Sequence, residues 1–456
     1  MNLVRIAYKS IRQRGVASSL TAVSVALGVT LMVAVLVING IIDRMFNQSA
    51  SAYDLIVGPK GSALQLVLNT VYRVSQPIEN LPYKYYLELA EDPRIETAIP
   101  FAIGDVTEEG SFPIVGTTST FFATEYLPGQ NLRVRGHFPR KPFDSVIGAT
   151  VAATNGWKEG DTFKLVHGGA ESDHVHDEEF TIVGVLAPTG TPNDKTVFVN
   201  LNGFYLVQGH EKPLDEAIRR WREFNGQPPL TDEQLQAEIA RTEPHHREAA
   251  HGHRHTASGD HNDHAHEVPD EQKEVTAILL RMKGNKFGSF FTLQLQAELK
   301  EGFKAQAANP VVQIRWLMQN VVGNVRTMLI VLTTLIIAVS GVGIFVSIYN
   351  SMADRRKEIA IMRALGARRT TVFAVILTES TLLCLAGGIL GLLLGHGLVF
   401  LAAPLVQARS GVLIDPFAFE PLELVLLVVL LGFASLVGFV PGLTAYRTDV
   451  AKTLSD

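Results

Sequence analysis

Residues 15–40 read GVASSLTAVSVALGVTLMVAVLVING and contain no charged side chain. A helix needs about 20 residues to cross a hydrocarbon layer of about 30 Å, so this stretch is long enough to span a membrane. Three more apolar stretches follow at residues 327–353, 380–407 and 424–446. Four such stretches in one chain predict transmembrane helices rather than the very hydrophobic core helices of a soluble protein.

These stretches define the organisation that we expect. The fold class is a helical membrane protein with four transmembrane helices and a large α+β extracytoplasmic domain inserted between helices 1 and 2. The predicted segments are a cytoplasmic amphipathic helix at 1–15, transmembrane helices at 16–40, 326–353, 370–405 and 423–446, the extracytoplasmic domain at 41–325, a cytoplasmic coupling loop at 354–369, an outer loop at 406–422 and a cytoplasmic tail at 447–456.

Basic residues set the orientation of the predicted helices. Four precede the first stretch, six follow the second, Arg447 and Lys452 follow the fourth, and the connection after the third has only Arg409. The positive-inside rule therefore predicts that both termini and the 354–369 loop are cytoplasmic. The first stretch is too long for the apolar region of a signal peptide, so we interpret it as an uncleaved anchor.

Composition limits the function classes. The chain of 456 residues is 47% hydrophobic and 19% charged, which fits concentrated apolar segments. Its formal net charge of −5 argues against a nucleic-acid partner. The one cysteine, Cys384, lies in an apolar stretch, so an exported domain has to fold without an internal disulfide.

Two patterns, one before the first apolar stretch and one within the third, each have two explanations. The spacing of Leu3, Ile6, Ala7 and Ile11 indicates an amphipathic helix on the inner leaflet, and a merely basic tail explains the same residues. In the third stretch, Gly387, Gly391 and Gly395 recur at intervals of four. Such a small-residue face lets helices approach closely, either within the subunit or between two copies.

The predicted cytoplasmic loop carries the most specific motif. Residues 355–367 read RRKEIAIMRALGA, which closely resembles the RKEIAIMRALGA signature of the MacB/FtsX superfamily of ABC permeases, also called type VII ABC transporters. The tail PGLTAYRTD at 441–449 is similar to the family's ending, with Val450 where proline is usual. Residues 147–161 and 184–194 resemble segments of its outer domain.

The resemblance implies a mechanism and partners. In this family the loop docks on an ATP-binding subunit, and the residues that would make this contact here are Arg355, Arg356, Lys357, Glu358, Ile359, Met362, Arg363, Leu365 and Gly366. Ile359, Met362 and Leu365 also form an apolar stripe at helical spacing, which suits a groove on a soluble partner. The resemblance further implies a homodimer in the bacterial inner membrane, in contact with lipid.

The sequence contains no G-x-x-x-x-G-K-[ST] phosphate loop, so we expect this chain not to be an enzyme and ATP to bind a separate subunit. The leading function is mechanotransmission for export or release of an envelope substrate, with a periplasmic adaptor as a possible partner class. The alternative is an FtsX-like signalling subunit that activates an envelope hydrolase. A metal-importing channel is disfavoured, because polar residues are scarce in the apolar stretches.

Histidines are concentrated outside the apolar stretches. Eight of the 14 lie in the segment 243–267, which we expect to be a loop, and an H-x-H pair occurs earlier. Imidazoles beside carboxylates are good ligands for Zn²⁺ and similar ions. The sequence therefore offers a transition-metal hypothesis, against the alternative of a solvated low-complexity loop, for His174, His176, His245, His246, His251, His253, His255, His261, His264 and His266.

Overall fold

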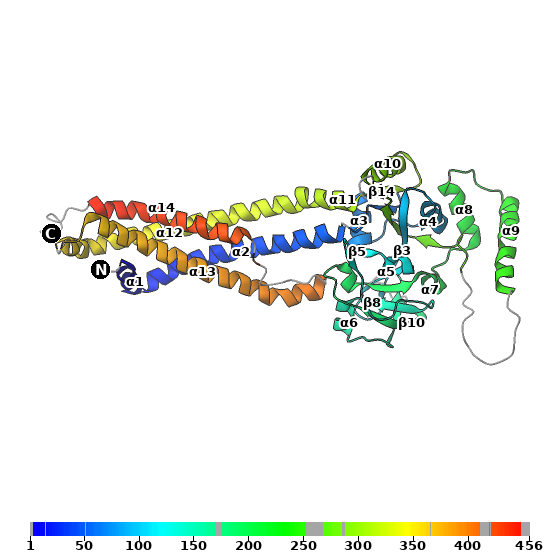
Figure 1. The fold of residues 1–456 in the computed structure, drawn as a ribbon, viewed down its shortest axis with the longest axis horizontal. Coiled ribbons are helices and arrows are strands. Elements are labelled where there is room, and N and C mark those ends of the chain that lie inside the picture. Colours follow the sequence, from blue (N-terminus) through cyan, green and yellow to red (C-terminus); the bar gives the residue numbers. More distant parts are fainter. Residues whose placement is uncertain are drawn as a thin grey trace. The chain divides into compact units, whose positions relative to one another are not determined.

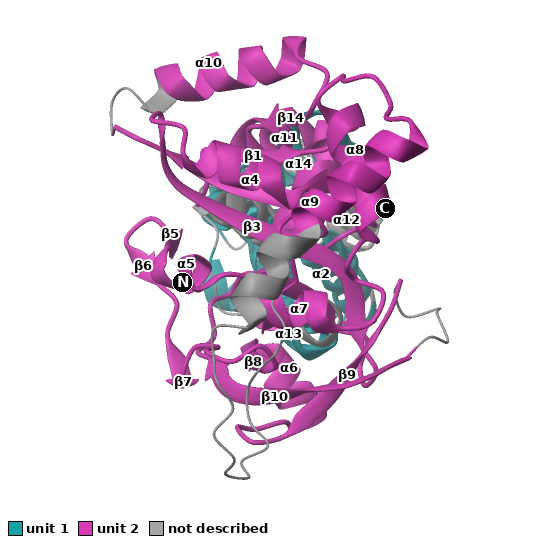
Figure 2. Cartoon of the chain, turned by 90° about the vertical axis from the view of Figure 1, so that its right-hand side faces the viewer, with its two compact units in different colours: residues 1–44, 318–407, 413–456 teal, residues 45–317, 408–412 magenta. Residues whose placement is uncertain are grey.

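The computed structural model describes residues 3–13, 15–50, 52–168, 175–251, 268–284, 288–364, 366–410, 419 and 421–447. It divides into two compact units, shown in different colours in Figure 2. The membrane unit comprises residues 1–44, 318–407 and 413–456. The outer unit comprises residues 45–317 and 408–412. Residues 45–317, which form nearly all of the outer unit, thus lie between the first and second long apolar helices.

The membrane unit is built from helices (Figure 1), namely α1 (Leu3–Gln13), α2 (Gly15–Ala50), α12 (Gly323–Ala364), α13 (Arg369–Ser410) and α14 (Pro421–Arg447). Among the described residues, three stretches are long and apolar enough to cross a membrane: Ser18–Gly40, Pro310–Val339 and Arg369–Leu405. Helix α14 adds the shorter apolar stretch Leu422–Leu436. Helix α2 is longer than the span predicted at 16–40, because residues 41–50 contain no helix-breaking residue.

The glycine face of α13 packs against α2 within the same chain. A Cβ atom added to Gly391 would lie 2.6 Å from Cβ of Val29, and one added to Gly395 would lie 2.8 Å from Cβ of Val33. Gly387 approaches Val25 in the same way. The hydroxyl of Thr30 also donates a hydrogen bond of 3.1 Å to the Gly391 carbonyl oxygen. These three glycines therefore serve a contact inside one subunit.

An acid and a histidine meet at the N-terminal end of α14. Glu423 is fully buried, and its Oε2 lies 2.9 Å from Nε2 of His396 on α13. A carboxyl group buried among membrane helices is costly unless it has such a partner. The pair therefore ties α13 to α14, and the apolar core of the membrane unit includes Cys384 of α13 together with Leu430 and Ala434 of α14.

The outer unit has two lobes that share one long strand. The first lobe is an antiparallel sheet in the order β14-β1-β13-β3. Its core includes Leu55, Ile278, Leu280 and Leu295. Its elements and their neighbours are β1 (Leu55–Gly58), α3 (Ala63–Tyr72), β2 (Leu81–Pro82), α4 (Tyr83–Ala90), β3 (Ile95–Thr107), α8 (Leu214–Phe224), α9 (Asp232–His251), β12 (Glu274–Val275), β13 (Ala277–Met282), α10 (Gly288–Glu301), β14 (Gln306–Ala308), α11 (Pro310–Leu317) and a π-helical turn (Met318–Val322).

The second lobe is a ring of six strands. Strand β3 pairs with β4, and the pairing continues through β11, β8, β10 and β9 back to β3. Phe163, Leu165 and Phe180 belong to the core of this ring. The lobe consists of β4 (Pro113–Thr117), α5 (Ser119–Ala123), β5 (Glu125–Leu127), β6 (Gln130–Asn131), β7 (Val134–Gly136), β8 (Asp144–Ile147), α6 (Ala149–Asn155), β9 (Thr162–Val166), β10 (Val175–Leu186), a 3-10 turn (Pro192–Lys195), β11 (Val197–Asn200) and α7 (Leu201–Leu206).

One prediction for the outer domain was wrong in its bounds. The segment 243–267 was expected to be a loop, but α9 continues through His251. The helix begun at Asp232 continues past Pro244 into residues 247–250, which read REAA and are good helix formers. Residues 252–267 lie outside the described part of the chain.

The glycine contact makes a stability prediction. Replacing Gly391 with alanine should destabilise the membrane unit by about 1–3 kcal/mol, because the new methyl group overpacks against Val29. The matched control is Gly397→Ala on the same helix, where nothing lies within 4 Å of an added Cβ. The control should be neutral or slightly stabilising, since alanine favours helix more than glycine does.

The measurement is thermal unfolding of the detergent-solubilised chain, followed with a thiol-reactive fluorophore. Cys384 is the one cysteine of the sequence and is buried in the membrane-unit core, so it reacts when that core opens. A lower midpoint for the Gly391 variant than for the Gly397 variant is expected. Equal midpoints would show that the close packing of α13 on α2 does not exist.

Candidate functional site

The basic segment that resembles the family motif forms the C-terminal end of α12. This helix runs without interruption from Gly323 to Ala364. The prediction of a coupling loop at 354–369 is wrong in form, because residues 354–364 belong to α12. Residues 354–364 contain no glycine or proline and consist mostly of strong helix formers, so the membrane helix continues through them.

The helix ends sharply after this segment. Gly366 adopts a left-handed conformation with φ of 97°, and its N–H donates a hydrogen bond of 3.0 Å to the Arg363 carbonyl oxygen. A glycine here is the usual way to end a helix, because a left-handed conformation strains other residues. Helix α13 begins at Arg369, so the turn between the two helices is only a few residues long.

The structure places the predicted coupling residues on one helix end but does not describe all of their side chains. The backbone of Arg355, Arg356, Lys357, Glu358, Ile359 and Met362 is helical, and Arg363 is half-buried. Leu365 and the side chains of residues 351–362 lie outside the described part.

A second group of functional side chains lies in the outer unit, at one end of the six-stranded ring. Val106 of β3 pairs with Val166 of β9, so the antiparallel register places Asp105 opposite His167. On its other side, β9 pairs with β10 through Val166 and Val175. His176 therefore follows on the neighbouring strand, and strand pairing gathers three side chains that are far apart in the sequence.

The fourth member comes from the connection between α7 and α8. His210 lies with its ring 4.4 Å from the ring of Phe204, a residue of the core of the six-stranded ring. Its ring centroid is 4.9 Å from that of His176 and 5.5 Å from that of His167. One potential ligand atom from each of these three histidines and from Asp105 lies within 4.8 Å of all the others. We call Asp105, His167, His176 and His210 the Asp-His cluster.

Asp105 is the centre of the cluster. Its Oδ1 lies 3.2 Å from Nδ1 of His167, and its Oδ2 lies 2.9 Å from Nε2 of His210. Burial alone would raise the pKa of the Asp105 carboxyl, but its interactions with His167 and His210 outweigh burial and lower the pKa to about 2. The same contact with Asp105 raises the pKa of the His167 imidazole. Asp105 is therefore a buried carboxylate at neutral pH.

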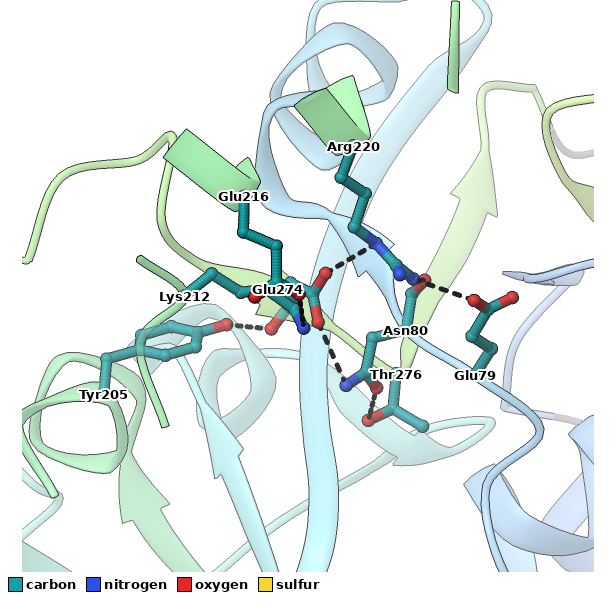
Figure 3. A network of polar contacts seen from close by, with 8 residues as sticks. All are labelled: Glu79, Asn80, Tyr205, Lys212, Glu216, Arg220, Glu274 and Thr276. Carbon is teal, nitrogen blue, oxygen red and sulfur yellow. Dashed lines mark hydrogen bonds and ion pairs between the residues drawn. The ribbon is translucent and has the colours of Figure 1, made fainter. Parts of the chain in front are cut away.

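The cluster borders a cavity of about 540 Å³ in the outer unit. Asp105, His167 and His210 line one side of it. Lys212, Glu216 and Glu274 also line the cavity and belong to the polar network drawn in Figure 3. In that network Arg220 lies 2.7 Å from Glu274, and Lys212 lies 2.7 Å from Glu216. The charges of this network are paired with one another. In the Asp-His cluster, by contrast, nitrogen and oxygen atoms converge on one point.

Of the ten predicted metal-binding histidines, the described part of the chain brings His176 into the cluster. His174 lies outside the described residues, as do His253, His255, His261, His264 and His266. His245, His246 and His251 lie on the C-terminal part of α9, and their side chains are not described. The prediction did not include Asp105, His167 and His210, because only the strand register and the α7–α8 connection bring them together.

Comparison with known proteins gives matches along most of the chain. The family model described as MacB-like periplasmic core domain matches residues 18–242, and the model described as FtsX-like permease C-terminal matches residues 330–450. The ABC transporter permease YtrF of Bacillus subtilis is 30% identical over 128 residues, which are 26% of this chain and 29% of that protein.

A macrolide export ATP-binding/permease protein MacB of Rhodopirellula baltica is 33% identical over 92 residues, which are 20% of this chain and 14% of that protein. The chain thus spans less than a third of the length of these two relatives. The crystal structure of the periplasmic region of MacB from Actinobacillus actinomycetemcomitans aligns with a TM-score of 0.30 at 10% identity, covering 59% of this chain and 95% of that one.

The two family matches follow one another in the order of the two units described above. The first begins in α2 and continues through most of the outer unit, and the second takes in α12, α13 and α14 almost completely. The chain therefore belongs to the MacB/FtsX family of ABC transporter permeases.

Proposed function

We propose that this permease transmits motion from an ATP-binding partner subunit to its own outer unit, without catalysing a reaction itself. The observation that carries the proposal is the continuity of α12 from Gly323 to Ala364. The segment that resembles the family's docking motif and the apolar stretch of the helix are parts of one rod. At about 1.5 Å per residue, a helix of this length spans about 60 Å.

Rigid continuity has a mechanical consequence. Helix α12 has 42 residues and no internal proline, with Ser340, Gly341 and Gly343 in its apolar part. We propose that it moves largely as one body, so that displacement at the Arg363 end moves the Gly323 end. The tight turn at Gly366 also links this motion to α13, which packs on α2 through Gly391. A push on the basic end of α12 is thereby distributed over the whole helix bundle.

The proposed topology has four transmembrane helices, both termini in the cytoplasm and the outer unit on the far side of a bacterial cytoplasmic membrane. It is supported by the basic residues before α2, at the end of α12 and after α14. We further propose that ATP binds a separate ABC subunit, since the sequence given has no phosphate loop, and that two copies of the permease work together.

We propose that the permease exports or releases an envelope substrate. Several relatives are named as export proteins, for macrolides in four cases and, as a probable export protein, for syringafactin in one. These relatives match only part of their length, so the substrate of this chain is not carried over from them. The FtsX-like signalling alternative uses the same α12 rod and differs in the partner outside the membrane.

Docking at the end of α12 predicts a sharp mutational effect. Met362→Arg should weaken binding of the ATP-binding subunit at least tenfold, because it places a charge in the apolar stripe that would enter the partner's groove. The measurement is co-purification of the partner with the permease, followed by its binding affinity in nanodiscs. Ala360→Arg adds the same charge on the other side of the helix and should bind nearly normally. Equal loss in both variants would contradict docking through the stripe.

Rigidity of α12 makes a separate prediction. Replacing Met352 and Ala353 together with glycine should keep the partner bound but uncouple it, because each glycine weakens the helix by about 1 kcal/mol. The readout is an environment-sensitive fluorophore at Val321→Cys, in a chain with Cys384→Ser, whose ATP-dependent signal should fall at least by half. Met352→Ala is the control and should keep the full signal. An unchanged signal in the double-glycine variant would show that α12 does not act as a rod.

A further inference from the structure

We propose that the outer unit binds one divalent transition-metal ion, for which zinc is the best match, through Asp105, His167, His176 and His210. The proposal concerns a site distinct from the coupling helix and goes beyond the permease function, and its test does not involve ATP.

The chemistry of the donor set selects this class of ion. Three imidazoles and one carboxylate suit Zn²⁺ and neighbouring divalent ions, whereas Mg²⁺ and Ca²⁺ prefer oxygen ligands alone. Thiolate-bound ions such as Cu(I) are disfavoured, because the one cysteine of the chain lies in the membrane-unit core.

The spacing of the donor atoms also fits. With metal–ligand bonds of about 2.0–2.1 Å, two ligand atoms of a tetrahedral zinc site lie about 3.3 Å apart. In the Asp-His cluster, the two contacts of Asp105 are 2.9 Å and 3.2 Å, and no pair of the four ligand atoms exceeds 4.8 Å. Small side-chain rotations suffice to bring all four atoms to one ion.

Hydrogen bonding around His210 indicates why a cation belongs there. Nδ1 of His210 lies 2.7 Å from the Phe204 carbonyl oxygen, so Nδ1 carries a proton and donates it to this acceptor. In the neutral ring, Nε2 then presents its lone pair to Oδ2 of Asp105. Both atoms are buried, and neither has a hydrogen bond of acceptable geometry among the described residues. A metal ion between them would take both atoms as ligands, and the Phe204 contact is the usual orienting bond of a ligand histidine.

Exposure divides the four ligands into a buried set and an accessible one. The side chains of Asp105 and His210 are 2% and 3% exposed, and His176 is 4% exposed. The His167 side chain is 55% exposed and lies at the cavity. We therefore assign His176, His210 and Asp105 as the retaining ligands and His167 as the exchangeable ligand through which the ion enters and leaves.

The test uses the full chain in nanodiscs, with the eight histidines between residues 245 and 266 replaced by serine to remove background binding. Titration with Zn²⁺ against a competing chelator should show one tight site. Either His176→Ala or His210→Ala should weaken it at least tenfold. Co²⁺ should give the intense visible absorption of a tetrahedral site, and these variants should lose it. Asp105→Asn, which keeps the shape of the side chain, should weaken binding in the same direction.

His167→Ala has a different expected effect. It should keep one bound ion but release it to a chelator at least tenfold faster, because the exchangeable ligand is gone. The control is His137→Ala, an exposed histidine of the outer unit away from the cluster, which should match the parent chain. Tryptophan emission monitors folding of every variant, since Trp157, Trp221 and Trp316 all lie in the outer unit.

Two results would overturn the proposal. One is the absence of a tight Zn²⁺ site in the serine-substituted parent chain, which would mean that the Asp-His cluster is only a hydrogen-bonded network. The other is unchanged Zn²⁺ affinity in folded His176→Ala and His210→Ala chains. An unchanged release rate in His167→Ala would overturn the assignment of the exchangeable ligand.

Discussion

A hydrocarbon layer offers no hydrogen-bond partner to a backbone amide, and the architecture of the membrane unit follows from that constraint. Each apolar segment has to be helical along its whole length, and in this chain the helices extend well beyond the apolar residues. Helix α2 continues to Ala50, and α12 runs on through the basic residues to Ala364. The bilayer accounts for the apolar part of each helix, and helix-forming residues account for the extension of α12.

Packing in the membrane unit relies on close backbone approach rather than on large side chains. The glycines of α13 let α2 lie against it, and the His396–Glu423 pair ties α13 to α14. Lipid competes equally well for apolar side chains, so small residues and buried polar pairs supply the specificity of such contacts. The outer unit follows the rules of a water-soluble fold, with apolar cores inside each lobe and its polar groups at the strand ends and the cavity.

The sequence allowed prediction of the features that depend on local pattern. The apolar stretches, the inserted outer domain and the family motif at 355–367 each depend on residues that are neighbours in the chain. Continuity of α12 past residue 353 was missed, because the change from apolar to basic residues suggests a loop, although most of residues 354–364 are strong helix formers.

The Asp-His cluster shows what local pattern cannot supply. Asp105 and His167 are opposite one another only because β3 pairs with β9 in one register, and His210 arrives from a connection between two helices. Most of the predicted metal-binding histidines lie in the histidine-rich segment at 245–266. Of the predicted set, His176 alone is described in the Asp-His cluster. Burial of a carboxylate against imidazoles is a tertiary property, and the spacing of the residues gives no sign of it.

The proposed coupling depends on α12 being one continuous helix, and hydrogen–deuterium exchange of the full chain in nanodiscs tests this continuity. Amides that belong to one stable helix exchange slowly as a cooperative unit. If α12 is continuous, protection extends without a break from residue 345 to about residue 362 and is followed by rapid exchange at the turn around Gly366. Rapid exchange within residues 351–360 would contradict it, because the docking segment would then be a separate, loosely joined element.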